Sequence, residues 1–237
     1  TLACVTAEGN DPLYLTELCV RLAVKLLGRA IPLRRDKRYP TVFEYLGWCS
    51  WDALQIRVSE RGLVEKCEEL KKKDIPIKWA IIDDMWAEVS EFPGKYRTRK
   101  DMFALMHSSH LYDYEAAKDR FPMGLSHAIE KMHSYGMKVG IWHPTTGYWR
   151  GLDPNGKAYE KLRSFTYTTP DGMIIGNWRE GASFRYYDAI HSFLRECGAD
   201  FVKVDNQSMT RRFYKGLDSV GKVTRSWHRG LEGSVGL

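Results

Sequence analysis

The sequence predicts an α/β fold, a (β/α)8 TIM-type barrel of which roughly the first four βα units are present. Three observations predict it. Segments with the helical period of 3.6 residues alternate with short apolar runs, the turns between them are short, and each run ends in Asp, His or Trp. Such alternation indicates a parallel sheet covered by helices. Polar residues at the strand ends favour a barrel, because barrel active sites collect there.

The first helix is expected to start at Asp11-Pro12, since Asp is a preferred N-cap and proline fits the first helical position. Gly28 can end this helix. Its apolar positions are Leu15, Leu18, Cys19, Leu22 and Leu26. After a basic connection, the first strand is predicted near 45–49.

Three further helix–strand units follow. Their helical patterns are carried by Leu63, Cys67 and Leu70, then by Leu125, Ile129 and Met132, and then by Tyr187, Ile190, Leu194 and Cys197. The strands after these helices are predicted near 77–82, 138–142 and 201–204. A last amphipathic helix carries Val220, Val223, Trp227 and Leu231.

The 237 residues hold only four of these units, because two long loops, 87–120 and 145–182, account for much of the length. A closed barrel needs eight strands and about 250 residues. We therefore expect residues 1–237 to form a single partial barrel domain, with the rest of the barrel encoded outside this sequence. An open doubly wound sheet is the alternative architecture, although its usual glycine-rich phosphate loop is absent from the sequence.

Composition excludes several classes of protein. The net charge of +6 comes in short clusters with no recognition motif, so no nucleic-acid partner is expected. No apolar run of about 18 residues is present, so no membrane span is expected. The five cysteines are scattered and odd in number, which favours core thiols in a reducing, cytoplasmic environment. No signal peptide is visible, and no metal or cofactor is expected.

The end of the fourth predicted strand carries a lysine and an aspartate, Lys203 and Asp205. Strand side chains alternate, so these two share one face with Phe201, while Val202 and Val204 share the other. A lysine would favour the ionised form of a neighbouring carboxylate and keep it nucleophilic. The pattern fits equally well a helix-capping Asp205 and an edge-strand Lys203.

Two adjacent acids, Asp83 and Asp84, close the second predicted strand. Neighbouring carboxylates can accept hydrogen bonds from several sugar hydroxyls. A divalent metal site would need further oxygen ligands at recognisable spacing, and none is found. A solvated turn remains the alternative, because Asp is common in turns.

Aromatic residues gather at or just beyond the predicted strand ends. An indole floor suits a sugar, which has apolar C–H faces and polar rims. Some of these tryptophans could be core residues, Trp48 and Trp142 among them, and His143 could be a polar contact or an ordinary packed histidine. The tryptophans are Trp48, Trp51, Trp86, Trp142 and Trp149.

Four ordered motifs resemble the raffinose synthase and seed-imbibition-protein branch of glycoside hydrolase family 36. The resemblance runs from about residue 10 to the end of the sequence, and order and spacing match as well as residues. The motifs are Leu46-Gly47-Trp48-Cys49-Ser50-Trp51-Asp52-Ala53, Ile81-Ile82-Asp83-Asp84-Met85-Trp86, Val139-Gly140-Ile141-Trp142-His143 and Phe201-Val202-Lys203-Val204-Asp205-Asn206-Gln207.

The resemblance implies a (β/α)8 barrel with retaining chemistry on α-galactosyl bonds. It implies that Asp205 is the nucleophile and that Lys203 contacts sugar hydroxyls beside it. The resemblance further implies that the acid/base aspartate lies beyond Leu237, outside this sequence. Its other implied substrate contacts are Asp83 and Asp84, which would bind the galactose 4- and 6-hydroxyls, and the pocket aromatics Trp51 and Trp142. Asp52 and His143, which lie in the same motifs, are further candidate substrate contacts.

Two residues depart from the pattern of that branch. Met85 stands where glycine is usual, and Asn206 stands where a small apolar residue is usual. The expected function is a retaining α-galactosidase acting on an α-galactoside oligosaccharide. A galactosyltransferase of the raffinose-synthase type would use the same site, and an inactive carbohydrate-binding barrel is the alternative from another class.

Overall fold

The computed structural model describes residues 3–28, 30–90 and 98–236, which form two compact units, Thr1–Glu44 and Tyr45–Leu237. The first unit contains helix α1 (Pro12–Leu27) and two short 3-10 turns, Arg34–Asp36 and Thr41–Glu44. Helix α1 has the expected ends, an Asp11 N-cap and a left-handed Gly28. Helix α1 buries none of its residues, and the contacts divide at residue 44. The single partial barrel domain over residues 1–237 stays a prediction.

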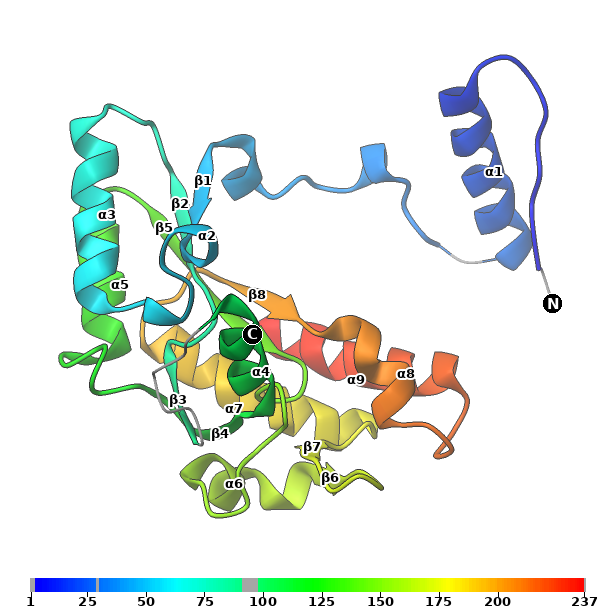
Figure 1. Ribbon diagram of the computed structural model, residues 1–237. Helices are drawn as coiled ribbons and strands as arrows, with labels where there is room; N and C mark the ends of the chain where they lie inside the picture. Colours follow the sequence, from blue (N-terminus) through cyan, green and yellow to red (C-terminus); the bar gives the residue numbers. More distant parts are fainter. Residues whose placement is uncertain (1–2, 29, 91–97, 237) are drawn as a thin grey trace. The chain divides into compact units, whose positions relative to one another are not determined.

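The second unit is built on a parallel sheet of four strands in the order β1-β2-β5-β8. This order follows the sequence, as Figure 1 shows, and all four strands lie where they were predicted. The outer strands β1 and β8 do not pair with each other in the described part of the chain, so the closed barrel stays a prediction. The strands are β1 (Gly47–Cys49), β2 (Trp79–Ile82), β5 (Lys138–Pro144) and β8 (Phe201–Asp205).

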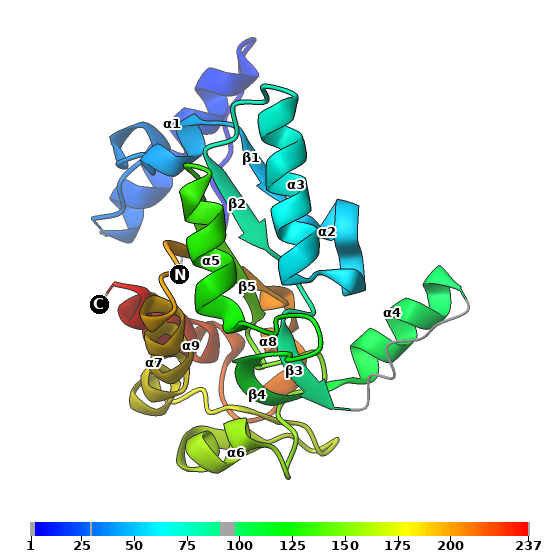
Figure 2. The same ribbon diagram turned by 90° about the vertical axis from the view of Figure 1, so that its left-hand side faces the viewer.

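A helix follows each of these strands before the next one begins. Helices α3 and α5 cover one face of the sheet over β1, β2 and β5 (Figure 2), and α7 packs against α9. Two glycines with positive φ lie in the turns between helix and strand: Gly136 at 80° between α5 and β5, and Gly198 at 91° between α7 and β8. The helices are α3 (Glu60–Lys72), α5 (Gly124–Ser134), α7 (Glu180–Glu196) and α9 (Val220–Val235).

The two predicted long loops contain secondary structure, which corrects the sequence interpretation. Segment 87–120 holds an antiparallel pair, β3 (Ala87–Ser90) and β4 (His110–Ala116), and helix α4 (Arg99–Ser108); residues 91–97 lie outside the described residues. Segment 145–182 holds α6 (Lys157–Leu162), the β6–β7 pair (Thr166–Thr168 and Ile174–Gly176) and the start of α7. These elements are too short to show a recognisable hydrophobic periodicity in the sequence. Two further short helices are α2 (Ser50–Leu54) and α8 (Thr210–Phe213).

The two faces of the sheet carry different side chains. On the helix-covered face, Ala80, Val139 and Ile141 are fully buried. On the opposite face, the rings of Trp79 and Phe201 meet edge to face at 6.0 Å. The close approach of Phe201 requires glycine at position 140, since a Cβ there would lie 2.2 Å from the ring. These rings close the amino-terminal end of this face and leave the polar residues at its carboxyl end.

Candidate active site

A cavity of about 200 Å³ lies at the carboxyl ends of β2, β5 and β8. Its lining combines three carboxylates, one lysine, aromatic rings and one methionine. Six of the eight predicted site residues line it: Asp205, Lys203, Asp83, Asp84, Trp51 and Trp142. The other lining residues are Phe103, Met106, His107 and Trp149.

Lys203 and Asp205 reach this cavity because β8 places alternate residues on one face. Val202 and Val204 point to the other face and pack against the core, as the alternation predicted. One oxygen of Asp205 accepts a hydrogen bond from the indole Nε1 of Trp142 at 3.1 Å. The other accepts the backbone N–H of Asn206 at 2.6 Å. These two donors fix the carboxylate at the end of the strand.

Lys203 pairs with Asp83, 120 positions away in the sequence. Its Nζ lies 2.6 Å from Oδ2 of Asp83, so the lysine of β8 reaches over β5 to the end of β2. Partial burial lowers the pKa of Lys203, but the hydrogen bond and charge of Asp83 outweigh it and raise the pKa overall. The lysine therefore stays charged. The sequence had suggested Asp205 as its partner, whereas the direct ion pair is with Asp83.

Asp83 is held by three further contacts. Its backbone N–H donates to the Ser50 hydroxyl at 2.9 Å, and its Oδ1 accepts the Asp84 backbone N–H at 2.9 Å. The Cys49 thiol lies 3.1 Å from Oδ2. Burial and Asp83 raise the pKa of Cys49 to about 11, so the thiol remains a protonated donor. Asp83 is only 3% exposed, which makes these donors necessary.

Asp84 is buried as deeply as its neighbour, at 2% exposure. Its Oδ2 accepts from the Trp149 indole at 2.7 Å, and its Oδ1 accepts from the Tyr148 hydroxyl at 2.7 Å and the Met85 backbone N–H at 2.6 Å. Complete burial nevertheless raises the pKa of Asp84 to about 7. Near neutral pH this carboxyl therefore exists in both protonation states.

The two departures from the family pattern occupy unusual backbone positions. Met85 has φ of 74° and Asn206 has φ of 62°, both in the left-handed region. Glycine would adopt this conformation at position 85 without strain, and asparagine tolerates it well at position 206. The Met85 side chain is buried, and its Sδ lies 2.8 Å from the Tyr148 hydroxyl oxygen.

Two of the five candidate tryptophans lie outside the cavity. The Trp86 indole donates to the backbone oxygen of Trp142 at 2.7 Å and is buried in the core, and Trp48 packs against the same core. Trp86 and Trp48 therefore pack as core residues and not as part of the cavity lining. Trp51, Trp142 and Trp149 line the cavity, the arrangement expected of an aromatic sugar pocket.

His143 lies outside this cavity, so its predicted contact with a substrate stays a prediction. Strand alternation turns His143 away from the cavity and toward α7, where its Nε2 lies 3.0 Å from Nε2 of His191. Burial lowers the pKa of His143 to about 4 and that of His191 to about 3, so both rings are neutral at pH 7. Asp52 also lies outside the cavity lining, because it is exposed, and its predicted contact with a substrate likewise stays a prediction.

Sequence reasoning missed Tyr148 and the α4 residues Phe103, Met106 and His107. A local signal for α4 is present, since Thr98 and Asp101 form a capping box at its start. Nothing in the sequence indicates that this helix reaches the strand ends. That position depends on contacts between distant segments.

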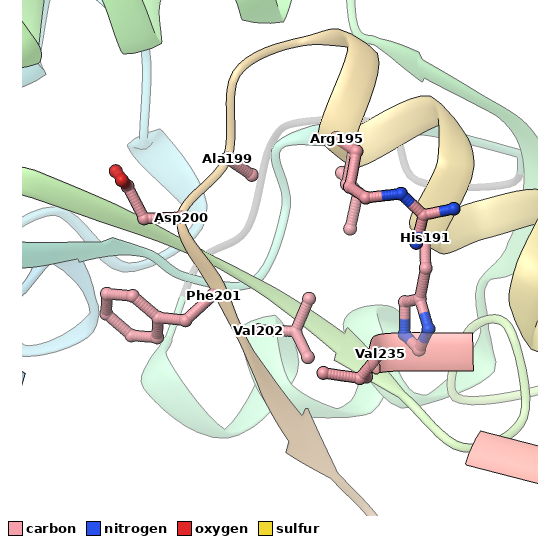
Figure 3. Close-up of a pocket in the computed structure, with 8 residues that line it drawn as sticks. His191, Arg195, Ala199, Asp200, Phe201, Val202 and Val235 are labelled. Atoms are coloured by element: carbon pink, nitrogen blue, oxygen red, sulfur yellow. The ribbon is translucent and has the colours of Figure 1, made fainter. Parts of the chain in front are cut away.

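A second cavity, of about 60 Å³, lies on the helix-covered side of β8. Figure 3 shows His191, Arg195, Val202 and Val235 facing one another there, while Asp200 and Phe201 point away. It lies away from the strand ends that carry the acids. Its lining residues are His191, Leu194, Arg195, Ala199, Asp200, Phe201, Val202 and Val235.

Within residues 3–28, 30–90 and 98–236, no group of three or more His, Cys, Asp or Glu side chains is placed to hold a metal ion. Over the same residues, no helix is long and apolar enough to cross a membrane. All five cysteines are free thiols.

The chain matches the family described as "Raffinose synthase or seed imbibition protein Sip1" over residues 3–236, and it belongs to that family. It is similar to the probable galactinol–sucrose galactosyltransferase 6 of Arabidopsis thaliana, with 27% identity over 96% of this chain and 33% of that protein. It is also similar to the α-galactosidase of Saccharomyces mikatae, with 23% identity over 77% of this chain and 37% of that protein. The chain thus spans about a third of the length of these relatives.

Among solved structures, the chain resembles a variant of a glycoside hydrolase family 36 α-galactosidase from Geobacillus stearothermophilus in complex with raffinose. The TM-score is 0.50 and the identity 16%, over 80% of this chain and 25% of that chain. At this identity the likeness concerns the fold. It agrees with the parallel α/β architecture described above.

Proposed function

We propose that this protein cleaves α-galactosides by a retaining double displacement in which Asp205 is the nucleophile. One observation carries the proposal: Asp205 of β8 lies in the same cavity as the Lys203–Asp83 ion pair, which joins β8 to β2. A carboxylate nucleophile beside fixed hydrogen-bonding groups is the arrangement that glycoside cleavage requires.

The first displacement forms a bond between an Asp205 oxygen and the anomeric carbon. The bond from that carbon to the leaving oxygen breaks, its electron pair stays on the leaving oxygen, and a general acid protonates that oxygen. Water then attacks the anomeric carbon, its proton goes to the same acid/base group, and the Asp205 carboxylate is released. Two inversions give net retention of configuration.

Asp83, Asp84 and Lys203 are proposed to bind sugar hydroxyls, and Trp51 and Trp142 to contact its apolar face. Lys203 donates from a charged ammonium, and the two carboxyls offer lone pairs that the protein donors leave free. The polar groups thereby orient the anomeric carbon toward Asp205. Such positioning supplies much of the rate enhancement of glycosidases.

The acid/base group is proposed to come from sequence outside this chain. A retaining pair needs its carboxyls about 5–5.5 Å apart, one on each side of the scissile bond. Asp83 is committed to Lys203, and Asp84 accepts hydrogen bonds from Trp149 and Tyr148. We accordingly propose that the sheet β1-β2-β5-β8 is half of a (β/α)8 barrel, whose remaining strands bring that group.

Transfer of the galactosyl unit to a sugar is the second candidate function. It is favoured by the relatives, since the probable galactinol–sucrose galactosyltransferase of Arabidopsis thaliana matches 96% of this chain. Transfer and hydrolysis share the first displacement and differ in whether a sugar or water attacks next. Product analysis of the full-length protein with galactinol and sucrose separates them, because transfer yields a trisaccharide and hydrolysis yields free galactose.

The nucleophile is tested in the full-length protein with Asp205→Asn and Asp205→Gly. Each should lower kcat on an aryl α-galactoside at least about a thousandfold. Azide added to Asp205→Gly should restore turnover and give the β-galactosyl azide, because azide replaces the carboxylate in a single inverting displacement. Asp119→Asn, which alters an exposed carboxylate outside the cavity, is the control. Undiminished turnover by Asp205→Asn would refute the proposal, because another group would then be the nucleophile, whereas absence of turnover by the unmodified full-length protein would favour the inactive binding protein.

A further inference from the structure

Helix α4 lies in segment 87–120, between β2 and α5, outside the strand–helix alternation of the sheet. Its start is fixed by the capping box, in which Thr98 Oγ1 accepts the Asp101 N–H at 3.2 Å and Asp101 accepts the Thr98 N–H at 3.1 Å. Met102 and Met106 are 1% exposed and anchor the helix in the core. This anchoring directs Phe103, together with Met106 and His107, into the cavity lining.

The α4 side chains complete a series of ring contacts around the cavity. Phe103 lies 6.2 Å from Trp51 and 6.0 Å from His107, measured between ring centroids. His107 meets Trp149 edge to face at 4.6 Å, and Trp149 lies 5.9 Å from Trp142. We refer to Trp51, Phe103, His107 and Trp149 as the aromatic rim.

Burial separates this rim from the floor of the cavity. Asp83, Asp84 and Trp142 are 3%, 2% and 2% exposed. The rim residues are more accessible: Trp51, Phe103 and Trp149 are half-buried, and His107 is exposed. The rim therefore lies between the buried floor and the solvent on the α4 side of the cavity.

We propose that Phe103 and His107 are specificity-determining residues that contact the sugar unit joined to the galactosyl group, so that the protein favours oligosaccharide α-galactosides. This inference rests on the proposed function. The groups proposed to hold the galactosyl unit, Asp83 and Asp84, are buried in the floor, and the rim lies next to them in the same cavity. The second ring of an oligosaccharide then lies at the rim.

The chemistry of the two side chains fits that position. The Phe103 ring offers an apolar face to sugar C–H groups. The His107 imidazole can donate to or accept from a hydroxyl, and no hydrogen bond engages it among the residues that the structure describes. Partial burial lowers the pKa of His107, which favours the neutral ring. The pair therefore offers stacking and hydrogen bonding next to each other, as an uncharged sugar requires.

The test compares raffinose with free galactose on the full-length protein, in Phe103→Ala and His107→Ala. Galactose occupies only the floor, so its inhibition constant should stay within about twofold. The KM for raffinose should rise about five- to tenfold in each variant, the range expected for loss of one stacking or hydrogen-bonding contact. Lys100→Ala, on the exposed side of α4, is the matched control and should change neither value.

Phe103→Leu, which keeps an apolar side chain and removes the ring, should show the same selective rise and covers the case in which Phe103→Ala does not fold. An equal change for raffinose and galactose would overturn the proposal, since it would place these side chains at the galactosyl unit. No change for either ligand would also overturn it. Failure of the unmodified protein to bind galactose would instead overturn the proposed function, and this inference with it.

Discussion

The carboxyl of Asp84 should make the stability of the protein depend on pH in an unusual direction. Its pKa is raised from 3.8 to about 7 because the group is completely buried, and the donors Trp149 and Tyr148 only partly offset that burial. The folded state therefore binds a proton more tightly than the unfolded state between these two pH values. Stability from this group is fully present below pH 4 and is lost as pH rises through about 7.

The size of the effect follows from the same values. Raising the pKa from 3.8 to about 7 corresponds to about 4 kcal/mol of destabilisation once Asp84 is ionised. Asp84→Asn cannot ionise, so the variant should lack this loss. It should also lose about 1 kcal/mol at every pH, since its amide N–H₂ cannot accept the hydrogen bond from the Trp149 indole. The difference between the two proteins should therefore change with pH, in favour of the variant at high pH.

The assay is urea unfolding of the full-length protein at several pH values from 4 to 8, with the midpoint followed by tryptophan fluorescence. Between pH 4 and pH 7, the unmodified protein should lose stability relative to Asp84→Asn by about 1.4 kcal/mol per pH unit at the steepest point. Asp119→Asn, which removes an exposed carboxylate, should run parallel to the unmodified protein. Parallel curves for Asp84→Asn would refute the reasoning, because Asp84 would then take up no extra proton on folding.

Two further predictions concern the inner face of the sheet. Lys203→Met should lower stability by about 1–2 kcal/mol. This loss is smaller than for a fully buried ion pair, because the side chain of Lys203 is 38% exposed, although that of Asp83 is only 4% exposed. Adding Asp83→Asn should recover part of that loss in a double-mutant cycle measured by denaturation. Gly140→Ala should cost about 1–3 kcal/mol by overpacking, since its Cβ would lie 2.2 Å from the Phe201 ring. Phe201→Leu should then relieve the clash, measured as a gain in unfolding midpoint over Gly140→Ala alone.

Each of these predictions has a distinct contrary outcome. Strict additivity of Lys203→Met and Asp83→Asn would show that the two groups do not interact across β5. A Gly140→Ala protein as stable as the parent would show that the backbone of β5 and the ring of Phe201 can separate at little cost. Neither result would bear on the role of Asp205.

Much of the fold follows from local patterns in the sequence. The period of 3.6 residues located α3, α5, α7 and α9, and the apolar runs located the four strands, because each element must bury one face. Alternation along β8 placed Lys203 and Asp205 on one face, opposite Val202. These rules need only neighbouring residues. The same rules left α4 and the β3–β4 pair hidden, since short elements show too few periods.

The position of His143 shows the limit of such reasoning. Trp142 and His143 are neighbours in the same motif, yet one lines the cavity and the other meets His191 of α7. Neighbouring residues of a strand point to opposite faces of the sheet, and near the end of a strand the sequence does not fix which of them points to the cavity.

The sequence by itself determined the order of the four sheet strands and of the helices between them, the family and the residues gathered at the strand ends, because periodicity and motifs are local properties. Only the tertiary structure decided that Lys203 pairs with Asp83, that Asp84 is buried enough to titrate near pH 7 and that α4 lines the cavity. Each of these depends on contacts between segments distant in the chain. The electrostatic environment of a carboxyl is set by what surrounds it in space, and that is the product of packing.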